Sequence, residues 1–445
     1  METQIKTPAP PAQRVLRLSE QLVEPGWLRE TRLKALEQFG QTPWPTGKEE
    51  IWRKTKIRYF QGNRFPEPEN SFGLSAADPI AELPKSLRDS FGTARDFSAI
   101  LIQETGQPCR RVLNENTIFL FDLPRAARFF QDDLSRFFSE KSRFFSTEKL
   151  ELLHEAFWNS GVFLKIPSGL FVERPVLNLT QMDAEARSVF PQTILWAQAN
   201  SSVTFVEIVR SDRNPSLLAR NTRVKILAEE GAQVRYFLLN LTTGRDTAYT
   251  SLQVVGKRDS SVHVGLFQLG GGVTKTHIHT DLVEPGASTT IQGLYFPDED
   301  QHTEVQTFQN HFENRTDSTL HLKGAVGGRG KAVYRGVIHI HPNAQDTSAY
   351  QLNNNLLLSS QAHADSNPVL EIEANEVRCS HGASAGPVDR DQLFYLQSRG
   401  LQPEKAKRVI VEGFFNPIID LLPTEWLREN IRRAVGDKIQ KEETD

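Results

Sequence analysis

Cysteine is scarce in this chain, which contains only two among 445 residues. Two cysteines cannot form a disulfide framework, and they are too few for an iron–sulfur cluster or structural zinc ion held by about four ligands of one chain. Basic residues are not in excess either, because 52 Lys and Arg stand against 55 Asp and Glu. The net charge of −3 argues against a dedicated nucleic-acid binder.

Long apolar runs are also missing. No stretch approaches the roughly 18 consecutive apolar residues that a membrane-spanning helix needs. The opening METQIKTPAPPAQRVLR lacks the apolar segment of a secretory signal peptide. We therefore expect a cytoplasmic protein with no membrane segment, and its length allows two or three domains.

Residues 1–150 predict a mostly helical region. Residues 25–40 carry apolar residues at helical spacing, with proline at the start and glycine at the end. Trp44 and Trp52 follow among proline and polar residues, and we expect them to pack on the neighbouring domain. Residues 60–100 show no clear pattern.

Residues 151–386 consist of short runs rich in Val, Ile, Thr, Phe and Tyr, separated by Gly, Pro and Asn. Pairs of small residues precede several runs, at spacings close to one or two units of roughly 28 residues, a period in the range of solenoids. Gly and Asn tolerate the left-handed backbone of tight corners. The pairs are Asn200-Ser201, Gly231-Ala232, Gly286-Ala287 and Asn343-Ala344. A coiled parallel sheet and a sandwich of hairpins both agree with this pattern.

Residues 387–445 predict a C-terminal helical subdomain. Asp389 is a candidate N-cap for a first helix, and Pro403 opens a second. The segment is rich in apolar residues for its length, and we expect part of this surface to pack on the preceding domain. Its apolar residues include Leu393, Phe394, Leu396, Val409, Phe414 and Phe415.

A candidate metal half-site lies just before these helices. Cys379 and His381 are two residues apart in a predicted strand, so both side chains leave the same face. Thiolate and imidazole are ligands that suit iron, zinc or copper. Two interpretations compete. Cys379 is a small buried hydrophobe and His381 a capping side chain, or the pair forms part of a site that another chain completes.

Two His-x-His pairs are weaker metal candidates: His277 with His279, and His339 with His341. On a strand, each pair shares one face and could hold a metal ion. Isoleucine alternates with the histidines, however, so the simpler interpretation is that they mark the polar side of their strands.

Two other motifs do not fit the chemistry that they suggest. The sequence at 382–386 matches the G-x-S-x-G elbow of hydrolases, but His381 is the last histidine and precedes Ser384. A glycine-rich piece has Ala332 after Gly330-Lys331, where a phosphate loop needs Ser or Thr. We expect neither a serine hydrolase nor a bound nucleotide.

Longer stretches resemble a known family. RCSHGASAG, followed by DQLFYLQSRGL and IVEGFF, is similar to the C-terminal signature of the SufB–SufD family, the scaffold proteins of Suf iron–sulfur cluster assembly. FWNSGVFLKIPSG (157–169), GLYFPDEDQH (293–302) and YRGVIHIHPNAQDTSAYQLNNNLLLS (334–359) resemble it as well. Gly382 after His381 is similar to the SufD branch, because SufB proteins carry Glu there. Ser384 stands where the family usually has Thr.

The resemblance implies a mainly β fold. In the implied fold, a right-handed parallel β-helix at 151–386 is flanked by helical regions at 1–150 and 387–445. It further implies a non-catalytic scaffold in a complex of SufB, two SufC and this SufD-like chain, with the two β-helices paired. Alone, the chain could pair with itself as a homodimer.

The same resemblance assigns roles to residues. His381 is the expected ligand of iron or of a transient iron–sulfur cluster shared with the SufB-like chain, and Cys379 is a second ligand or sulfur acceptor. The C-terminal helices are expected to dock SufC, an ATPase of the ABC type. The expected partner-binding residues are Leu393, Phe394, Leu396, Val409, Phe414 and Phe415.

Three alternatives remain open at this point. A SufB-like scaffold would nucleate a cluster alone, which the single promising cysteine argues against. A polysaccharide-active β-helix enzyme is disfavoured by the missing secretion signal and the lack of a recognisable catalytic cluster. A binding module without any metal role is the third.

Overall fold

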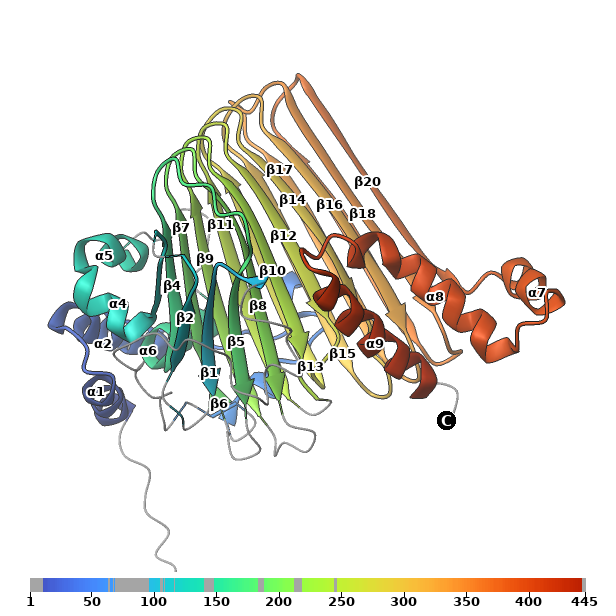
Figure 1. The fold of residues 1–445 in the computed structure, drawn as a ribbon, viewed down its shortest axis with the longest axis horizontal. Coiled ribbons are helices and arrows are strands. Elements are labelled where there is room, and N and C mark those ends of the chain that lie inside the picture. Colours follow the sequence, from blue (N-terminus) through green and yellow to red (C-terminus); the bar gives the residue numbers. More distant parts are fainter. Residues whose placement is uncertain are drawn as a thin grey trace, which may run out of the picture.

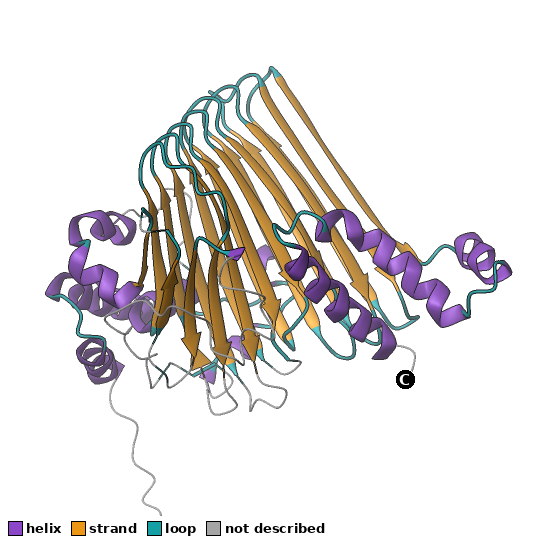
Figure 2. Ribbon diagram, viewed as in Figure 1, coloured by secondary structure: helices purple, strands orange, loops and turns teal. Residues whose placement is uncertain are grey.

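A two-sheet solenoid forms the body of the protein (Figure 1). The structure is a computed structural model, and it describes residues 11–62, 65–66, 68, 96–104, 107, 109–115, 117–139, 148–182, 188–211, 218–243 and 246–441. From β8 onward the chain alternates between the sheets, so each coil contributes one strand to each. Figure 2 shows the strands as a long stack, with the N-terminal helices near one end, two C-terminal helices across one face and one helix beyond the other end.

In sheet 1 the strand order is β2 (Arg110–Leu113), β1 (Ala99–Glu104), β5 (Val176–Met182), β8 (Ser202–Ser211), β10 (Gln233–Leu241), β12 (Ser261–Gln268), β14 (Ser288–Tyr295), β16 (Asp317–Val326), β18 (Thr347–Leu357) and β20 (Val377–Pro387). In sheet 2 it is β19 (His363–Ile372), β17 (Lys331–Ile340), β15 (His302–His311), β13 (Val273–Leu282), β11 (Thr247–Gly256), β9 (Ala219–Ala228), β7 (Pro191–Ala197), β4 (Ser160–Ile166) and β3 (Phe119–Asp122). The short β6 (Ser188–Val189) lies beside β9.

The strands within each sheet are parallel and lie one coil apart in sequence. Gln233 is in register with Ser261, Ser261 with Ser288, and Ser288 with Asp317. Each partner stands one predicted period further along the chain, which confirms that period and the parallel β-helix core flanked by helices. The pairing excludes the sandwich of hairpins, because among the described strands only β1–β2 and β3–β4 pair antiparallel.

From β7 to β18, each corner that leads from a strand of sheet 2 to the next strand of sheet 1 has a residue with left-handed backbone. Asn200, Gly231 and Gly286 were predicted from the sequence and have φ of 57°, 66° and 76°. The other three corners have Asp259, Arg315 and Asp346 in this conformation, and these residues gave no sequence signal because they are neither Gly nor Asn. The turn predicted at Asn343 before β18 is confirmed, but the left-handed residue of that corner is Asp346 and not Asn343. Backbone hydrogen bonds between successive corners, such as Gly286 N–H to Asn314 O at 3.3 Å, keep the stack aligned.

Helices near the N-terminus cover part of the outer face of sheet 2. Trp52 is buried and stacks on Tyr249 of β11, with ring centroids 6.3 Å apart, which confirms it as an anchor. Trp44 packs edge-on against Phe39, within the helical region itself. Strands β1, β2 and β3 also lie in this N-terminal region, and no sequence pattern indicated them. The helical elements are α1 (Pro11–Gln21), α2 (Gly26–Gln41), η1 (Glu50–Trp52), η2 (Ile57–Phe60), α4 (Leu123–Phe129), α5 (Gln131–Ser139) and α6 (Lys149–Phe157).

Three helices follow β20: α7 (Arg390–Ser398), α8 (Pro403–Ile419) and α9 (Glu425–Lys441). α8 and α9 pack on the outer face of sheet 1, where Phe415 shares a cluster with Phe296. α7 has no buried residue and projects beyond the last strand in Figure 1. Asp389 caps α7, since its carboxylate accepts a hydrogen bond from the Asp391 N–H at 2.8 Å. No helix in the described part of the chain is long and apolar enough to cross a membrane.

Candidate metal sites in the last two coils

The last coil leaves both sheets with an open edge. β20 pairs with β18 on one side, and β19 pairs with β17 on one side. Within the described residues, no strand covers the other side of either. The backbone groups along such an edge are a template for pairing with a strand of another chain.

Cys379 and His381 occupy the inward-facing row of this open coil. They are in register with Ala349 and Gln351 of β18, whose side chains are buried in the solenoid. No described coil follows β20, so His381 is exposed and Cys379 is only partly covered, by a small apolar cluster that includes Ile340. The spacing argument is confirmed in that both residues share one row. The histidine can be reached from outside the chain.

Burial raises the pKa of the Cys379 thiol, and a hydrogen bond with the backbone of Ala349 partly opposes this shift. The protonated thiol is a poor ligand, so binding of a metal there has to displace its proton. Cys109 is 2% exposed within the core, and burial places the pKa of its thiol well above the usual value. It packs as a hydrophobic side chain.

The six residues expected to bind a partner divide into three groups. Phe394 and Val409 are 73% and 42% exposed. Leu393, Leu396 and Phe414 are half-buried. Phe415 is fully buried against sheet 1 and anchors α8 there. Tyr395 was not among the expected residues, and it is 56% exposed beside Phe394. The sequence signal for this exposed pair was two adjacent aromatic residues in a short predicted helix, since neighbouring positions cannot both face the same side.

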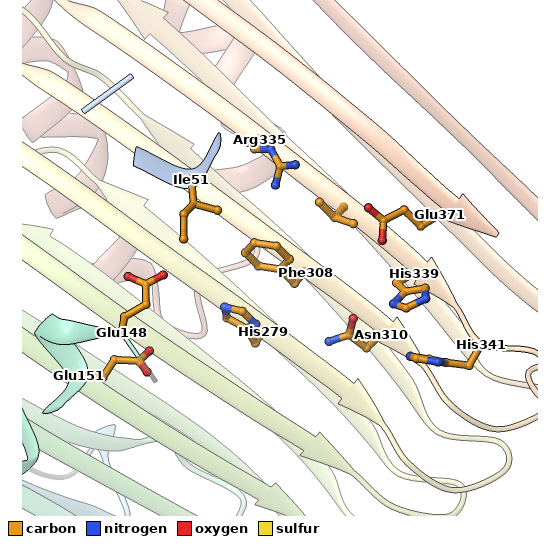
Figure 3. A pocket seen from close by; sticks show the side chains of 11 residues that line it. Ile51, Glu148, Glu151, His279, Phe308, Asn310, Arg335, His339, His341 and Glu371 are labelled. Atoms are coloured by element: carbon orange, nitrogen blue, oxygen red, sulfur yellow. The ribbon is translucent and has the colours of Figure 1, made fainter. Parts of the chain in front are cut away.

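A second group of ligand-type side chains lies on the outer face of sheet 2 (Figure 3). His339 Nε2 and Glu373 Oε1 are 2.7 Å apart. Ligand atoms of His339, His341 and Glu373 all lie within 4.8 Å of one another. His339 and His341 also line a cavity of about 290 Å³ together with Glu371 and Asn310.

The two glutamates were missed because neither stands near the histidines in sequence. Glu371 lies one coil after His339, and the two are in register on β19 and β17. Glu373 continues the same alternation, two positions further along the chain. The available signal was a His-x-His pair followed one coil later by a Glu-x-Glu pair.

The other histidine pair is different. His277 and His279 are 1% and 8% exposed beneath the N-terminal region, and Ile278 between them points into the core, as the alternation predicted. His279 stacks on Phe308 with ring centroids 4.3 Å apart. Burial lowers the pKa of His277 well below its usual value and that of His279 to about 3, so both rings are neutral at physiological pH.

Ser384 of the G-x-S-x-G motif is exposed on the open strand. Its hydroxyl accepts a hydrogen bond from Asn354 Nδ2 at 2.8 Å. A nucleophile elbow is a sharp turn between a strand and a helix. Here the motif lies inside β20 in extended backbone, so the structure agrees with the expectation that it is no elbow.

Comparisons with known proteins agree with the architecture. The family described as "SUF system FeS cluster assembly, SufBD core domain" matches residues 179–414. The chain is 28% identical over 428 residues to the iron-sulfur cluster assembly protein SufD of Bacillus subtilis (strain 168), covering 95% of this chain and 96% of that protein. It is 25% identical to an iron-sulfur cluster assembly SufBD family protein of Staphylococcus saprophyticus, covering 93% of this chain and 90% of that protein. The matched region contains most of the solenoid, its last coil, α7 and most of α8, and the chain therefore belongs to the SufB–SufD family of the SUF system.

Proposed function

We propose that this chain is a non-catalytic scaffold subunit in iron–sulfur cluster assembly, and that His381 and Cys379 provide half of a site for iron or a nascent cluster. The observation that carries the proposal is the exposed position of His381 in the inward row of a coil with no described successor. Iron or the cluster is the cargo of this site. It is held transiently while a partner chain supplies the remaining ligands.

The need for a partner follows from the ligand count. Tetrahedral zinc and iron–sulfur sites take about four protein ligands. Cys379 and His381 supply only two ligands. The other cysteine, Cys109, is buried in the core and distant from them in sequence. A second subunit facing the open coil would complete the coordination sphere.

The open edges offer that subunit a place to bind. β19 and β20 together present two unpaired strand edges, and Ile372 at the end of β19 is 42% exposed. A SufB-like chain with a matching open edge could continue both sheets across the interface. The inward rows of the two solenoids would then face each other, with Cys379 and His381 at the junction.

The C-terminal helices suit a second partner. α7 begins shortly after β20 ends and has no fully buried side chain within this chain. We assign its exposed aromatic pair, Phe394 and Tyr395, together with Val409 of α8, to docking a SufC-like ABC ATPase. Leu393 and Leu396 support this surface, whereas Phe414 and Phe415 hold α8 on sheet 1. Movement of the docked ATPase during its nucleotide cycle would be transmitted to β20 through the short connection.

Co-expression with the SufB and SufC proteins of the same organism tests the proposal. The intact assembly is measured by native mass spectrometry, and its cluster by visible absorbance and by transfer to an apo-ferredoxin. We expect His381→Ala to leave the assembly intact and to reduce cluster content severely, with a smaller loss for Cys379→Ser. Ser380→Ala, on the same strand but facing the other side, is the matched control.

Two results would contradict this function. One is full cluster assembly and transfer by the His381→Ala complex. The other is a stable cluster reconstituted on the purified chain alone at one per chain, because that would make the missing ligands unnecessary.

A further inference from the structure

We propose that His339, His341 and Glu373 form a second metal site, which binds one divalent ion of the later first transition series, such as Fe²⁺ or Zn²⁺. The site lies on the outer face of sheet 2, whereas Cys379 and His381 belong to the inward row of β20. It is therefore independent of the proposed half-site, although Glu373 lies in the same last coil as Cys379 and His381; His339 and His341 belong to the coil before it.

The solenoid itself builds the arrangement. Asn310, His339 and Glu371 are in register on β15, β17 and β19, so their side chains leave the same face in one row. A second row follows two positions later, where the N–H of His341 donates to the His311 carbonyl at 3.0 Å and that of Glu373 donates to the Ile340 carbonyl at 2.9 Å. Two imidazoles and two carboxylates thus share a patch of about 5 by 7 Å, from the spacing of strands and of alternate residues.

The distances are close to those of a metal centre. Zinc binds histidine nitrogen and carboxylate oxygen at about 2.0–2.2 Å, which places tetrahedral ligands roughly 3.3 Å apart. The ligand atoms of His339, His341 and Glu373 lie within 4.8 Å of one another without an ion. Rotation of exposed side chains suffices to close this gap, because Glu373 is 53% exposed.

The charges favour a cation. Among the described residues, neither Glu371 nor Glu373 makes an ion pair with Lys or Arg. Arg335, the one arginine lining the cavity, binds Glu50 at 2.9 Å instead. Glu373 instead contacts His339, with Oε1 and Nε2 2.7 Å apart. The patch combines two carboxylates with two imidazoles, and a divalent ion would balance the negative charge.

The nitrogen ligands are held in place, and the site stays accessible. His341 stacks on Phe312 with ring centroids 4.2 Å apart, and the His339 and His341 rings are 4.0 Å apart. Two histidines and one carboxylate suit Fe²⁺ and Zn²⁺ more than the oxygen-seeking Mg²⁺ or Ca²⁺. The adjoining cavity leaves room for Glu371, water or a small anion as a further ligand (Figure 3).

The experiment uses the full chain in a Cys379→Ser/His381→Ala background, so that the proposed half-site cannot contribute. Calorimetry with Zn²⁺ and visible absorbance of added Co²⁺ measure the stoichiometry and affinity. We expect one ion per chain, and Co²⁺ bands typical of low coordination number. His339→Ala, His341→Ala and Glu373→Gln should each weaken binding by at least about tenfold, since even outer partners of metal ligands contribute 10–100-fold.

His363→Ala is the control. It removes an exposed histidine from β19, on the same outer face of sheet 2 as Glu371, without touching the site. Circular dichroism of the metal-free variants checks that the fold is intact. The proposal is overturned if the background protein shows no saturable binding at one ion per chain. It is equally overturned if the His339→Ala and Glu373→Gln variants, shown to be folded, bind as tightly as the background protein. Either result leaves the role of His381 untouched, because the two sites share no residue.

Discussion

His381 and Gln351 are paired residues of adjacent strands, and one is exposed while the other is fully buried. Both belong to the inward row of sheet 1, but β20 covers Gln351 and no described strand covers His381. Gln351 accepts a hydrogen bond from the Tyr334 hydroxyl at 2.9 Å and donates to the Val369 carbonyl at 3.3 Å. The same row is therefore core in one coil and surface in the next.

This difference predicts opposite effects on stability. His381→Ala should change the free energy of unfolding by no more than about 0.5 kcal/mol, as is usual for an exposed side chain. Gln351→Ala should lower it by roughly 1–3 kcal/mol, because it leaves buried polar partners unsatisfied. Urea unfolding followed by circular dichroism measures both. A large loss for His381→Ala would mean that this residue is structural in the isolated chain.

The C-terminal helices give a second matched pair. Phe394→Ala should weaken co-purification with the SufC-like ATPase at unchanged stability, since the side chain is 73% exposed. Phe415→Ala should lower the free energy of unfolding by about 3–5 kcal/mol, because it empties a packed core position. Pull-down assays and thermal melts separate the two effects. Undiminished binding of the ATPase by a Phe394→Ala/Tyr395→Ala double variant would remove α7 from the docking surface.

The open edges predict self-association when the chain is purified by itself. We expect a concentration-dependent dimer in analytical ultracentrifugation, and Ile372→Lys should shift it to monomer by placing a charge on the edge. The same change should abolish binding of a SufB-like chain. Gln233→Lys, an exposed position in the middle of sheet 1, is the control. A dimer that survives Ile372→Lys unchanged would indicate association through another surface.

Glu148 predicts a pH-dependent stability. Burial and the neighbouring Glu151 raise its pKa to about 8, although Lys275 and a hydrogen bond from Tyr249 favour its ionised form. The folded protein keeps a proton that the unfolded chain releases above its ordinary pKa of 4.5. Stability should therefore fall as pH rises from about 4.5 to 8, by up to roughly 1.4 kcal/mol per pH unit.

Glu148→Gln should flatten this slope, because the amide resembles the protonated carboxyl group. Denaturant unfolding between pH 5 and pH 8 measures it, with Glu230→Gln at an exposed corner as the control. Equal slopes in the wild-type and Glu148→Gln proteins would show that Glu148 is ionised in the folded state.

The sequence by itself determined the period of the solenoid and the placement of a thiol and an imidazole on one face of a strand. The solenoid period, the corners at Asn200, Gly231 and Gly286, and the shared face of Cys379 and His381 all follow from local backbone rules. These features depend on neighbours in the chain, so they are visible in a single sequence.

Only the tertiary structure decided which residues meet across coils and which stay exposed. Glu373 reaches His339 because one coil of the solenoid returns the chain to the adjacent strand, a distance in sequence that no local pattern encodes. Phe394 and Phe415 look alike in the sequence, yet Phe394 lies on a helix without a fully buried residue and Phe415 packs on sheet 1. Exposure depends on whether another layer covers a residue, and that is a property of the assembled fold.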